Sequence, residues 1–172
     1  MRSSHQAVIA LGANLGEADR ALIEAMGAIS ELPHTHVIAS SRIFRTAPIG
    51  GPEQPDYQNA VAIISTQLTP MGLLDALHVI ENAHGRERGV RWGPRTLDLD
   101  IITFDDVRSD DPHLTLPHPR AHERAFVLMP WCDADPNAQW IDGHRVDAMV
   151  AELDEQDCVA ASMQRVHEMV GS

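Results

Sequence analysis

Residues 91–102 read Arg-Trp-Gly-Pro-Arg-Thr-Leu-Asp-Leu-Asp-Ile-Ile, and the second half of this stretch decides the fold. Side chains alternate between the two faces of a β-strand, so Leu97, Leu99 and Ile101 are predicted to share one face. Asp98 and Asp100 would lie together on the other face, with Cα atoms about 6–7 Å apart. A divalent cation would relieve the repulsion between these carboxylates. The pattern predicts a strand with a core face and a Mg²⁺-binding face; the alternative is a pair of solvent-exposed acids.

The segment before this strand is rich in arginine. Arg86, Arg88, Arg91 and Arg95 fall within ten residues, and Glu87 is the one acid among them. The planar guanidinium group matches the geometry of phosphate oxygens, so the cluster favours a polyphosphate ligand. The alternative is a solvated basic loop. Together with the two aspartates, the arginines predict a Mg²⁺–polyphosphate site.

Composition excludes several other functions. The formal net charge of −12 argues against general nucleic-acid binding, which needs a broad basic surface. All 13 basic residues are arginine, so P-loop and Schiff-base lysines are excluded. Two cysteines make neither a disulfide framework nor a four-ligand zinc site, and no apolar run is long enough to span a membrane. We expect a cytoplasmic, monomeric protein with one domain over residues 1–172.

Hydrophobic periodicity predicts the order β-α-β-β-α-β over residues 6–104. This order is typical of an α+β, ferredoxin-like core, a largely antiparallel sheet with helices packed on it. Residues 105–172 would form a C-terminal elaboration. Thr69 is expected to cap a helix that has Pro70 in its first turn. The expected core elements are Gln6–Leu11, Glu17–Leu32, Thr35–Phe44, Tyr57–Thr66, Thr69–His84 and Leu97–Phe104. The expected later helical pieces are Glu123–Trp131, Val146–Leu153 and Ser162–Met169.

Several segments together resemble one enzyme family. Residues 91–102 are similar to the signature of the 6-hydroxymethyl-7,8-dihydropterin pyrophosphokinases of folate synthesis. Residues 10–16 (ALGANLG), 44–59 (FRTAPIGGPEQPDYQN) and 116–126 (LPHPRAHERAF) resemble further segments of that family in the same order. The resemblance implies transfer of pyrophosphate from ATP to the pterin hydroxymethyl group, with release of AMP and a requirement for Mg²⁺.

The resemblance also implies roles for individual residues. Asp98 and Asp100 would hold two Mg²⁺ ions, and Arg86 and Arg95 would stabilise the group in transfer. Tyr57 and Phe126 would stack on the pterin, and Asn59 would bind its edge. The nucleotide would be bound by His78, Glu81, Arg88, Arg91, Trp92, Ile101, Thr115, His118 and Arg124. The pterin pocket would be formed by Thr46, Ala47, Ile49, Tyr57, Asn59, Trp92 and Phe126.

This sequence departs from the family pattern in places. Residues 85–92 are about one residue shorter and contain no lysine, and Pro119 and His113 replace residue types that are frequent there. Two alternatives stay open: a ferredoxin-like module that binds a ligand without turnover, and a different Mg²⁺-dependent nucleotidyl or phosphoryl transferase. The nucleotide products distinguish these two alternatives from a pyrophosphokinase, because only the pyrophosphokinase releases AMP.

Overall fold

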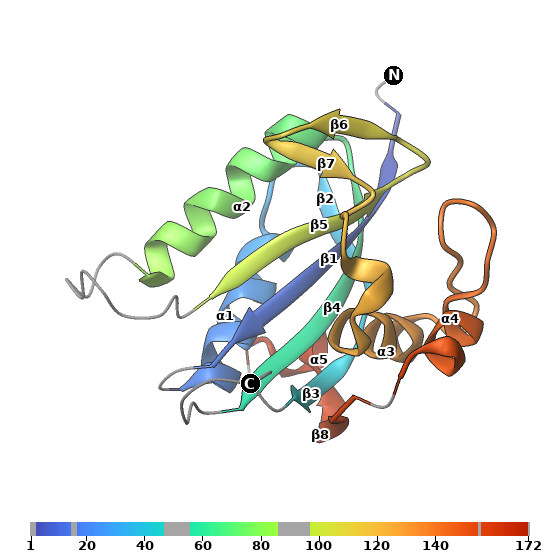
Figure 1. Ribbon diagram of the computed structural model, residues 1–172. Helices are drawn as coiled ribbons and strands as arrows, with labels where there is room; N and C mark the ends of the chain where they lie inside the picture. Colours follow the sequence, from blue (N-terminus) through green and yellow to red (C-terminus); the bar gives the residue numbers. More distant parts are fainter. Residues whose placement is uncertain (1–2, 15–16, 47–55, 86–96, 155, 172) are drawn as a thin grey trace.

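The computed structural model describes residues 3–14, 17–46, 56–85, 97–154 and 156–171, and it shows a sheet with helices on both faces (Figure 1). The first part of the chain follows the expected order, except that the second strand is divided in two. The elements are β1 His5–Ala13, α1 Ala18–Ser30, β2 Thr35–Ser40, β3 Arg42–Thr46, β4 Tyr57–Thr66, α2 Pro70–Gly85 and β5 Asp98–Phe104.

The break between β2 and β3 lies at Ser41. Both strands pair with β4, but the register changes by one residue between Ser40, opposite Ala62, and Phe44, opposite Asn59. At the break the Ser41 hydroxyl accepts the Val61 N–H at 2.9 Å, in place of a backbone carbonyl. A side chain therefore maintains the hydrogen bonding where the ladder is interrupted.

The strand order is β5-β1-β4-β3-β8, where β8 is Cys158–Arg165; β2 is also paired to β4, and each of these pairings is antiparallel. Without β8, this is the order of a split β-α-β arrangement, in which β1 lies between β4 and β5. The ferredoxin-like prediction is confirmed. β1 is the single strand that connects β5 to the rest of the sheet among the described residues.

Helices α1 and α2 pack on one face of the sheet (Figure 1). The apolar stripe of α1 is buried, and Leu73 and Leu77 of α2 are fully covered. The start of α2 is capped as expected, because the Thr69 hydroxyl accepts the Gly72 N–H at 3.0 Å and Pro70 occupies the first turn. The buried side of the sheet contributes Ala7, Ile9, Leu11, Ala60, Ala62, Ile64, Leu97, Leu99 and Ile101.

Helix α3, Ala125–Ala134, packs on the opposite face of the sheet. Its residues Leu128 and Trp131 are buried against Val8, Val61 and Ile63. Further along the same strands, toward the C-terminal end of β1, this face carries polar side chains instead. The sheet therefore offers one partly uncovered, polar surface, and the candidate site lies there.

A β-bulge changes the phase of β5. Ile9 of β1 is opposite Ile101, but the preceding Val8 is opposite Thr103, so Ile102 is an extra residue. After the bulge Phe104 enters the core beneath the helices, while Thr103 faces the α3 side. The carbonyl of Ile102 accepts the His118 N–H at 2.9 Å. The bulge thus also attaches the segment around His118 to the sheet.

The C-terminal part is only partly as expected. A hairpin, β6–β7, and an added edge strand, β8, are present, and the helix around Val146 is confirmed. The helix expected over Ser162–Met169 is wrong for its first half, since β8 extends to Arg165. The elements are β6 Ser109–Asp111, β7 Leu114–Leu116, a 3₁₀-turn Ala121–Glu123, α3 Ala125–Ala134, α4 Val146–Glu152, β8 Cys158–Arg165 and α5 Val166–Met169.

Strand pairing explains this error. β8 pairs with β3, and the Ser162 hydroxyl accepts the Ile43 N–H at 2.9 Å. Pairing to an open sheet edge therefore outweighs the helical propensity of this short segment. Among the described residues, no helix is both long and apolar enough to cross a membrane.

Candidate active site

Asp98 and Asp100 lie on the face of β5 that points away from helices α1 and α2. Leu97, Leu99 and Ile101 are 2–3% exposed, whereas Asp98 is half-buried and Asp100 is exposed. The alternation predicted from the sequence is confirmed. The two acids therefore need no place in the core, and their carboxylates can meet a ligand from solvent.

The strand register places the acids beside the proposed pterin residues. Asp98 is opposite Gly12 of β1, and Gly12 is opposite Asn59 of β4. Residues that are directly opposite each other in antiparallel strands point to the same face. Two strand spacings separate Asp98 from Asn59, or about 10 Å. Residues far apart in the sequence thus form one row across the open face.

Asn59 and Thr46 form a buried polar pair within this row. Asn59 is 6% exposed and Thr46 is 7% exposed, and the Asn59 amide nitrogen donates to the Thr46 hydroxyl at 2.8 Å. Tyr57 is directly opposite Thr46 and points to the same face. Phe126, at the start of α3, packs against clusters that contain Phe44 and Val61, the neighbours of Asn59. The structure therefore brings Thr46, Tyr57, Asn59 and Phe126 together.

Gly12 was missed in the sequence reasoning, although a glycine inside a strand often marks a close approach. A Cβ atom on Gly12 would lie 3.1 Å from Oδ1 of Asn59. We expect Gly12→Ala to displace the Asn59 amide by a few tenths of an ångström and to raise KM for the pterin about five- to tenfold. Steady-state kinetics with each substrate varied would show little change in kcat and in KM for ATP. Equal changes in both KM values would contradict this role of Gly12.

His118 and Arg124 lie beside Asp100. Burial lowers the pKa of His118, the negative charge of Asp100 raises it, and the positive charge of Arg124 lowers it; the net pKa is below its ordinary value. The Nδ1 atom of His118 accepts the Arg120 N–H at 3.3 Å, so a neutral ring carries its proton on Nε2. The Arg124 guanidinium lies 5.4 Å from the centre of the Phe126 ring. Phosphate oxygens at Asp100 would therefore meet hydrogen-bond donors on this side.

The other nucleotide residues lie around the outer edge of β5, toward α2 and β7. The Glu81 carboxylate accepts the Leu99 N–H at 2.8 Å, between the two aspartates. His78 is exposed one helical turn earlier, and Ile101 is buried beneath the helices. The Thr115 hydroxyl donates to the Asp111 carbonyl at 3.1 Å. Contact of these four residues with a nucleotide stays a prediction.

The contact of Glu81 indicates that it positions the strand that carries Asp98 and Asp100. We expect Glu81→Ala to loosen the edge of β5 and to raise the Mg²⁺ concentration for half-maximal activity about fivefold. Glu81→Gln, which retains an oxygen acceptor, should restore most of the response. Activity measured as a function of Mg²⁺ concentration checks the Mg²⁺ response, and hydrogen exchange of the Leu99 amide checks the loosening of the β5 edge. A change in KM for ATP alone would instead mean that Glu81 acts on the nucleotide.

Seven of the predicted site residues lie outside the described residues. They include both arginines assigned to catalysis and part of the pterin loop. They are Arg86, Arg88, Arg91, Trp92, Arg95, Ala47 and Ile49.

The donor groups on the open face fit Mg²⁺. Within the described parts of the chain, no three His, Cys, Asp or Glu side chains converge on one possible metal position. Mg²⁺ does not require such a cage, because it retains several waters and binds one or two carboxylates together with substrate phosphates. A half-buried and an exposed carboxylate on one strand supply such a partial ligand set.

Comparisons with known proteins agree with this geometry. The model of the family "7,8-dihydro-6-hydroxymethylpterin-pyrophosphokinase (HPPK)" matches residues 8–136. The 2-amino-4-hydroxy-6-hydroxymethyldihydropteridine pyrophosphokinase of Pseudomonas aeruginosa is 43% identical over 143 residues, which cover 83% of this chain and 88% of that protein. The protein of the same name from Haemophilus influenzae is 48% identical over 124 residues, covering 72% of this chain and 78% of the relative.

Solved structures give the same fold at lower sequence identity. A crystal structure of HPPK-DHPS from Plasmodium falciparum superposes with a TM-score of 0.70 at 14% identity. The match covers 88% of this chain but 44% of that longer chain, so it bears on the fold alone. From the family match and the relatives, we conclude that this chain belongs to the 7,8-dihydro-6-hydroxymethylpterin-pyrophosphokinase family.

Proposed function

We propose that this protein transfers the β,γ-pyrophosphoryl group of ATP to the hydroxymethyl oxygen of 6-hydroxymethyl-7,8-dihydropterin. The products are the pterin diphosphate and AMP, in the synthesis of tetrahydrofolate. Family membership supports this reaction. The observation that carries the proposal is the row Asp98–Gly12–Asn59, in which the carboxylate proposed to bind the metal and the amide proposed to bind the pterin share one face of the sheet.

The reaction is proposed to depend on two Mg²⁺ ions. Such ions, when bound, would supply positive charge that partly neutralises the triphosphate. Asp98 and Asp100 would hold them, since both carboxylates face the open side of β5. Arg86 and Arg95 are proposed to offset the negative charge of the group in transfer, as the arginine-rich sequence before β5 suggests. Phosphoryl transfer depends mainly on such alignment and charge neutralisation.

Asn59 is proposed to orient the pterin. One of its amide hydrogens is occupied by the Thr46 hydroxyl, so its second hydrogen and its carbonyl oxygen are available to the edge of a ring. Tyr57 and Phe126 flank this position and would stack on the ring. The fixed amide would aim the hydroxymethyl group toward the β5 side, where the phosphates are held.

His118 and Arg124 are proposed to bind phosphate oxygens as donors. Because the pKa of His118 is lowered, its ring is neutral at neutral pH, with Nε2–H free to donate. The cation–π contact with Phe126 orients the Arg124 guanidinium, which supports its proposed place between the pterin and the nucleotide. We assign no general base, since the described site residues offer none with a suitable geometry.

One assay tests the reaction. The protein is incubated with ATP, MgCl₂ and the reduced pterin alcohol, and the nucleotide products are separated. We expect one AMP for each pterin diphosphate, and we expect EDTA in excess over Mg²⁺ to stop the reaction. ADP or pyrophosphate as the product would indicate a different transferase. Ligand binding without any product would indicate a module that does not catalyse.

We further propose that the chain acts in the cytoplasm, as one domain and as a monomer. The strands of the ferredoxin-like core all belong to one continuous sheet, which supports a single unit. Light scattering after size exclusion should give a mass near 18.9 kDa. A mass of twice that value would contradict the monomer.

A further inference from the structure

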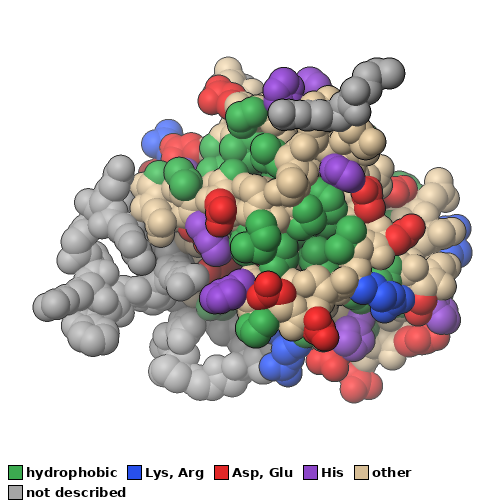
Figure 2. Space-filling view, turned by 90° about the horizontal axis from the view of Figure 1, so that it is seen from above, with side chains coloured by type: hydrophobic (Ala, Val, Ile, Leu, Met, Phe, Trp, Pro, Cys, Tyr) green, Lys and Arg blue, Asp and Glu red, His purple; other side chains and the backbone are tan. Residues whose placement is uncertain are grey.

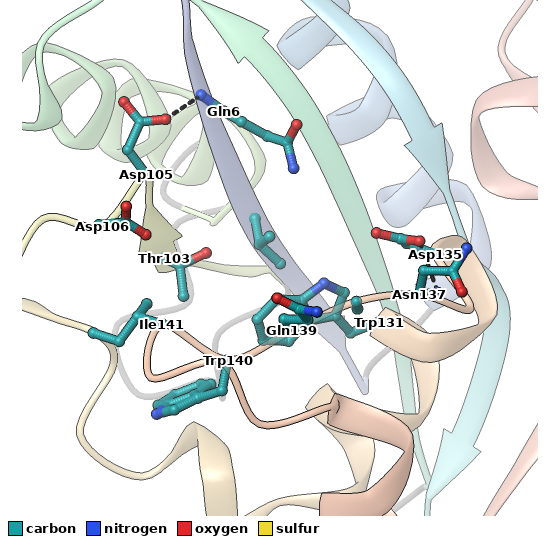
Figure 3. Close-up of a pocket in the computed structure, with 13 residues that line it drawn as sticks. Gln6, Thr103, Asp105, Asp106, Trp131, Asp135, Asn137, Gln139, Trp140 and Ile141 are labelled. Carbon is teal, nitrogen blue, oxygen red and sulfur yellow. Dashed lines mark hydrogen bonds between the residues drawn. The ribbon is translucent and has the colours of Figure 1, made fainter.

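A second pocket lies on the α3 side of the sheet, away from Asp98 and Gly12. Val8 precedes Gly12 by four residues along β1, or about 13 Å, and Thr103 follows Asp100 by about 10 Å along β5. The pocket has a volume of about 650 Å³, a size suited to a small organic molecule. Figure 3 shows it between the end of β5, the end of α3 and the loop at residues 137–143.

The Thr103 hydroxyl points into this pocket without a hydrogen-bonding partner among the described residues. Thr103 is 7% exposed, and Figure 3 shows its oxygen turned toward the centre of the pocket. The hydroxyl oxygen is accessible from the pocket, since Gln58 Oε1 is the one fully buried side-chain polar atom without a partner among the described residues, and a ligand or water can therefore bind it. This hydroxyl is therefore a hydrogen-bonding group that the fold itself does not use.

Three carboxylates give the pocket its charge. Asp105 is already bonded to the Gln6 N–H and the His5 ring, at 2.8 and 2.7 Å. Asp106 and Asp135 also line the pocket, although one oxygen of Asp135 already accepts the Asn137 N–H at 2.9 Å, and the lining includes no arginine. An anion such as a nucleotide is thus disfavoured. The carboxylates do not converge on one point, since no metal-binding group of three is present among the described residues, so a single metal ion fits poorly.

The carboxylates stand on opposite sides of an apolar floor. Figure 3 shows Asp106 on the β5 side and Asp135 on the α3 side, with Trp131 between them. Trp131 and Val8 are each 3% exposed and form the floor with Ala138. A matching ligand has a positive charge at each end and an apolar chain between the charges.

We propose that this pocket binds a linear diamine or polyamine. One ammonium group lies between Asp106 and the Thr103 hydroxyl, which accepts a hydrogen bond from it. The other ammonium group lies at Asp135. The methylene chain covers the apolar floor, which is favourable because apolar surface of both the ligand and the floor is removed from water. The proposal is independent of the pyrophosphokinase reaction, because none of its residues belongs to the candidate active site.

Matched ligands test the proposal by isothermal titration calorimetry of the full chain. We expect 1,5-diaminopentane to bind saturably at one site. We expect n-pentylamine, with one charge, to bind at least tenfold more weakly, and 1,5-pentanediol to give no binding heat. Equal affinity of n-pentylamine and 1,5-diaminopentane, or no saturable binding of the diamine, would overturn the proposal. Ionic strength is held constant, since surface charge attraction depends on salt.

Variants distinguish diamine binding in the pocket from weak attraction of cations to the acidic surface. On the face shown in Figure 2, Asp and Glu side chains are widely spread and arginines are sparse, so weak attraction of cations elsewhere is expected. Thr103→Val, Asp106→Asn and Asp135→Asn should each weaken diamine binding about tenfold. Asp157→Asn, an exposed acid before β8, should leave it unchanged. Equal effects of the pocket variants and this control would refute the pocket as the binding site.

The fold of the variants is checked by thermal unfolding. Asparagine at position 135 retains the oxygen that accepts the Asn137 N–H at 2.9 Å. Because the Thr103 hydroxyl has no partner among the described residues, Thr103→Val should unfold at the same or a higher temperature. A marked loss of stability would show that the hydroxyl serves the fold, and would contradict the role proposed for it.

Discussion

Asp100→Ala is expected to lower the rate of AMP formation about a thousandfold, while the unfolding temperature stays unchanged. Asp100 is exposed, and removing its carboxylate leaves no buried group unpaired among its described neighbours. The expected loss is that of a carboxylate which is proposed to act only through the bound metal and phosphates. The measurement is kcat at saturating ATP, pterin and Mg²⁺, with thermal unfolding of the same sample.

Asp110→Ala is the matched control, because Asp110 is an exposed acid on the β6–β7 hairpin. It should retain the activity of the unmodified protein. Near-normal turnover of Asp100→Ala would show that this carboxylate does not hold the metal. Asp100→Ala has a second expected consequence. Because the negative charge of Asp100 raises the pKa of His118, removing that charge should lower the pKa of His118 further.

Asp133→Ala is expected to lower the free energy of unfolding by about 2–3 kcal/mol. The side chain of Asp133 is 14% exposed and lies at the end of α3. It accepts the Arg42 N–H at 2.9 Å and the Arg42 guanidinium at 3.0 Å, and it lies 3.4 Å from the Arg165 guanidinium. Three elements, β3, α3 and β8, meet at this carboxylate. The exposure of both arginines, about two fifths, keeps the expected loss below that of a fully buried pair.

The contribution of Asp133 also depends on pH. Burial raises the pKa of Asp133, but the hydrogen bonds and positive charge of Arg42, with the charge of Arg165, outweigh burial and hold the pKa below its ordinary value. A lowered pKa in the folded state stabilises the fold above the unfolded-state pKa of about 4, and this contribution is lost as pH falls through the folded-state pKa. Neutral and alkaline pH leave it intact.

Urea unfolding between pH 2.5 and pH 7 measures this dependence. The difference in unfolding free energy between the unmodified protein and Asp133→Ala should be largest at pH 7 and should shrink in acid. Asp133→Asn should lose most of the same stability, because an amide cannot accept from both arginines as a carboxylate does. A difference that stays constant over the whole range would show that the carboxylate charge has no part in it.

Local patterns predicted much of the fold. Strand period alone placed Leu99 in the core and Asp98 and Asp100 outside it, and both placements are confirmed. Thr69 and Pro70 marked the start of α2 because capping depends on residues within one helical turn. Such features need only neighbours in the sequence, so the sequence alone is enough to predict them.

Features that depend on distant partners could not be predicted in this way. The β8 strand exists because the β3 edge is available, which the sequence around Ser162 does not encode. Gly12 and Asn59 are neighbours because of the register between β1 and β4. The hydrogen bond from the Leu99 N–H to the Glu81 carboxylate likewise joins residues that are 18 positions apart. For the site, the family resemblance named Asn59 and Asp98, but only the register shows that they share a row.

The bulge at Ile102 means that β5 follows two opposite substitution rules. Before it, odd-numbered positions require hydrophobic side chains and even-numbered positions tolerate charge; after it, Phe104 fills the core and Thr103 faces the α3 side. If the same residues paired with β1 without the bulge, Ile102 would be opposite Val8 and Thr103 opposite Ala7, so Thr103 would face the core and Phe104 the α3 side. A defect in pairing is thus what allows a single strand to supply acids to one site and a hydroxyl to another.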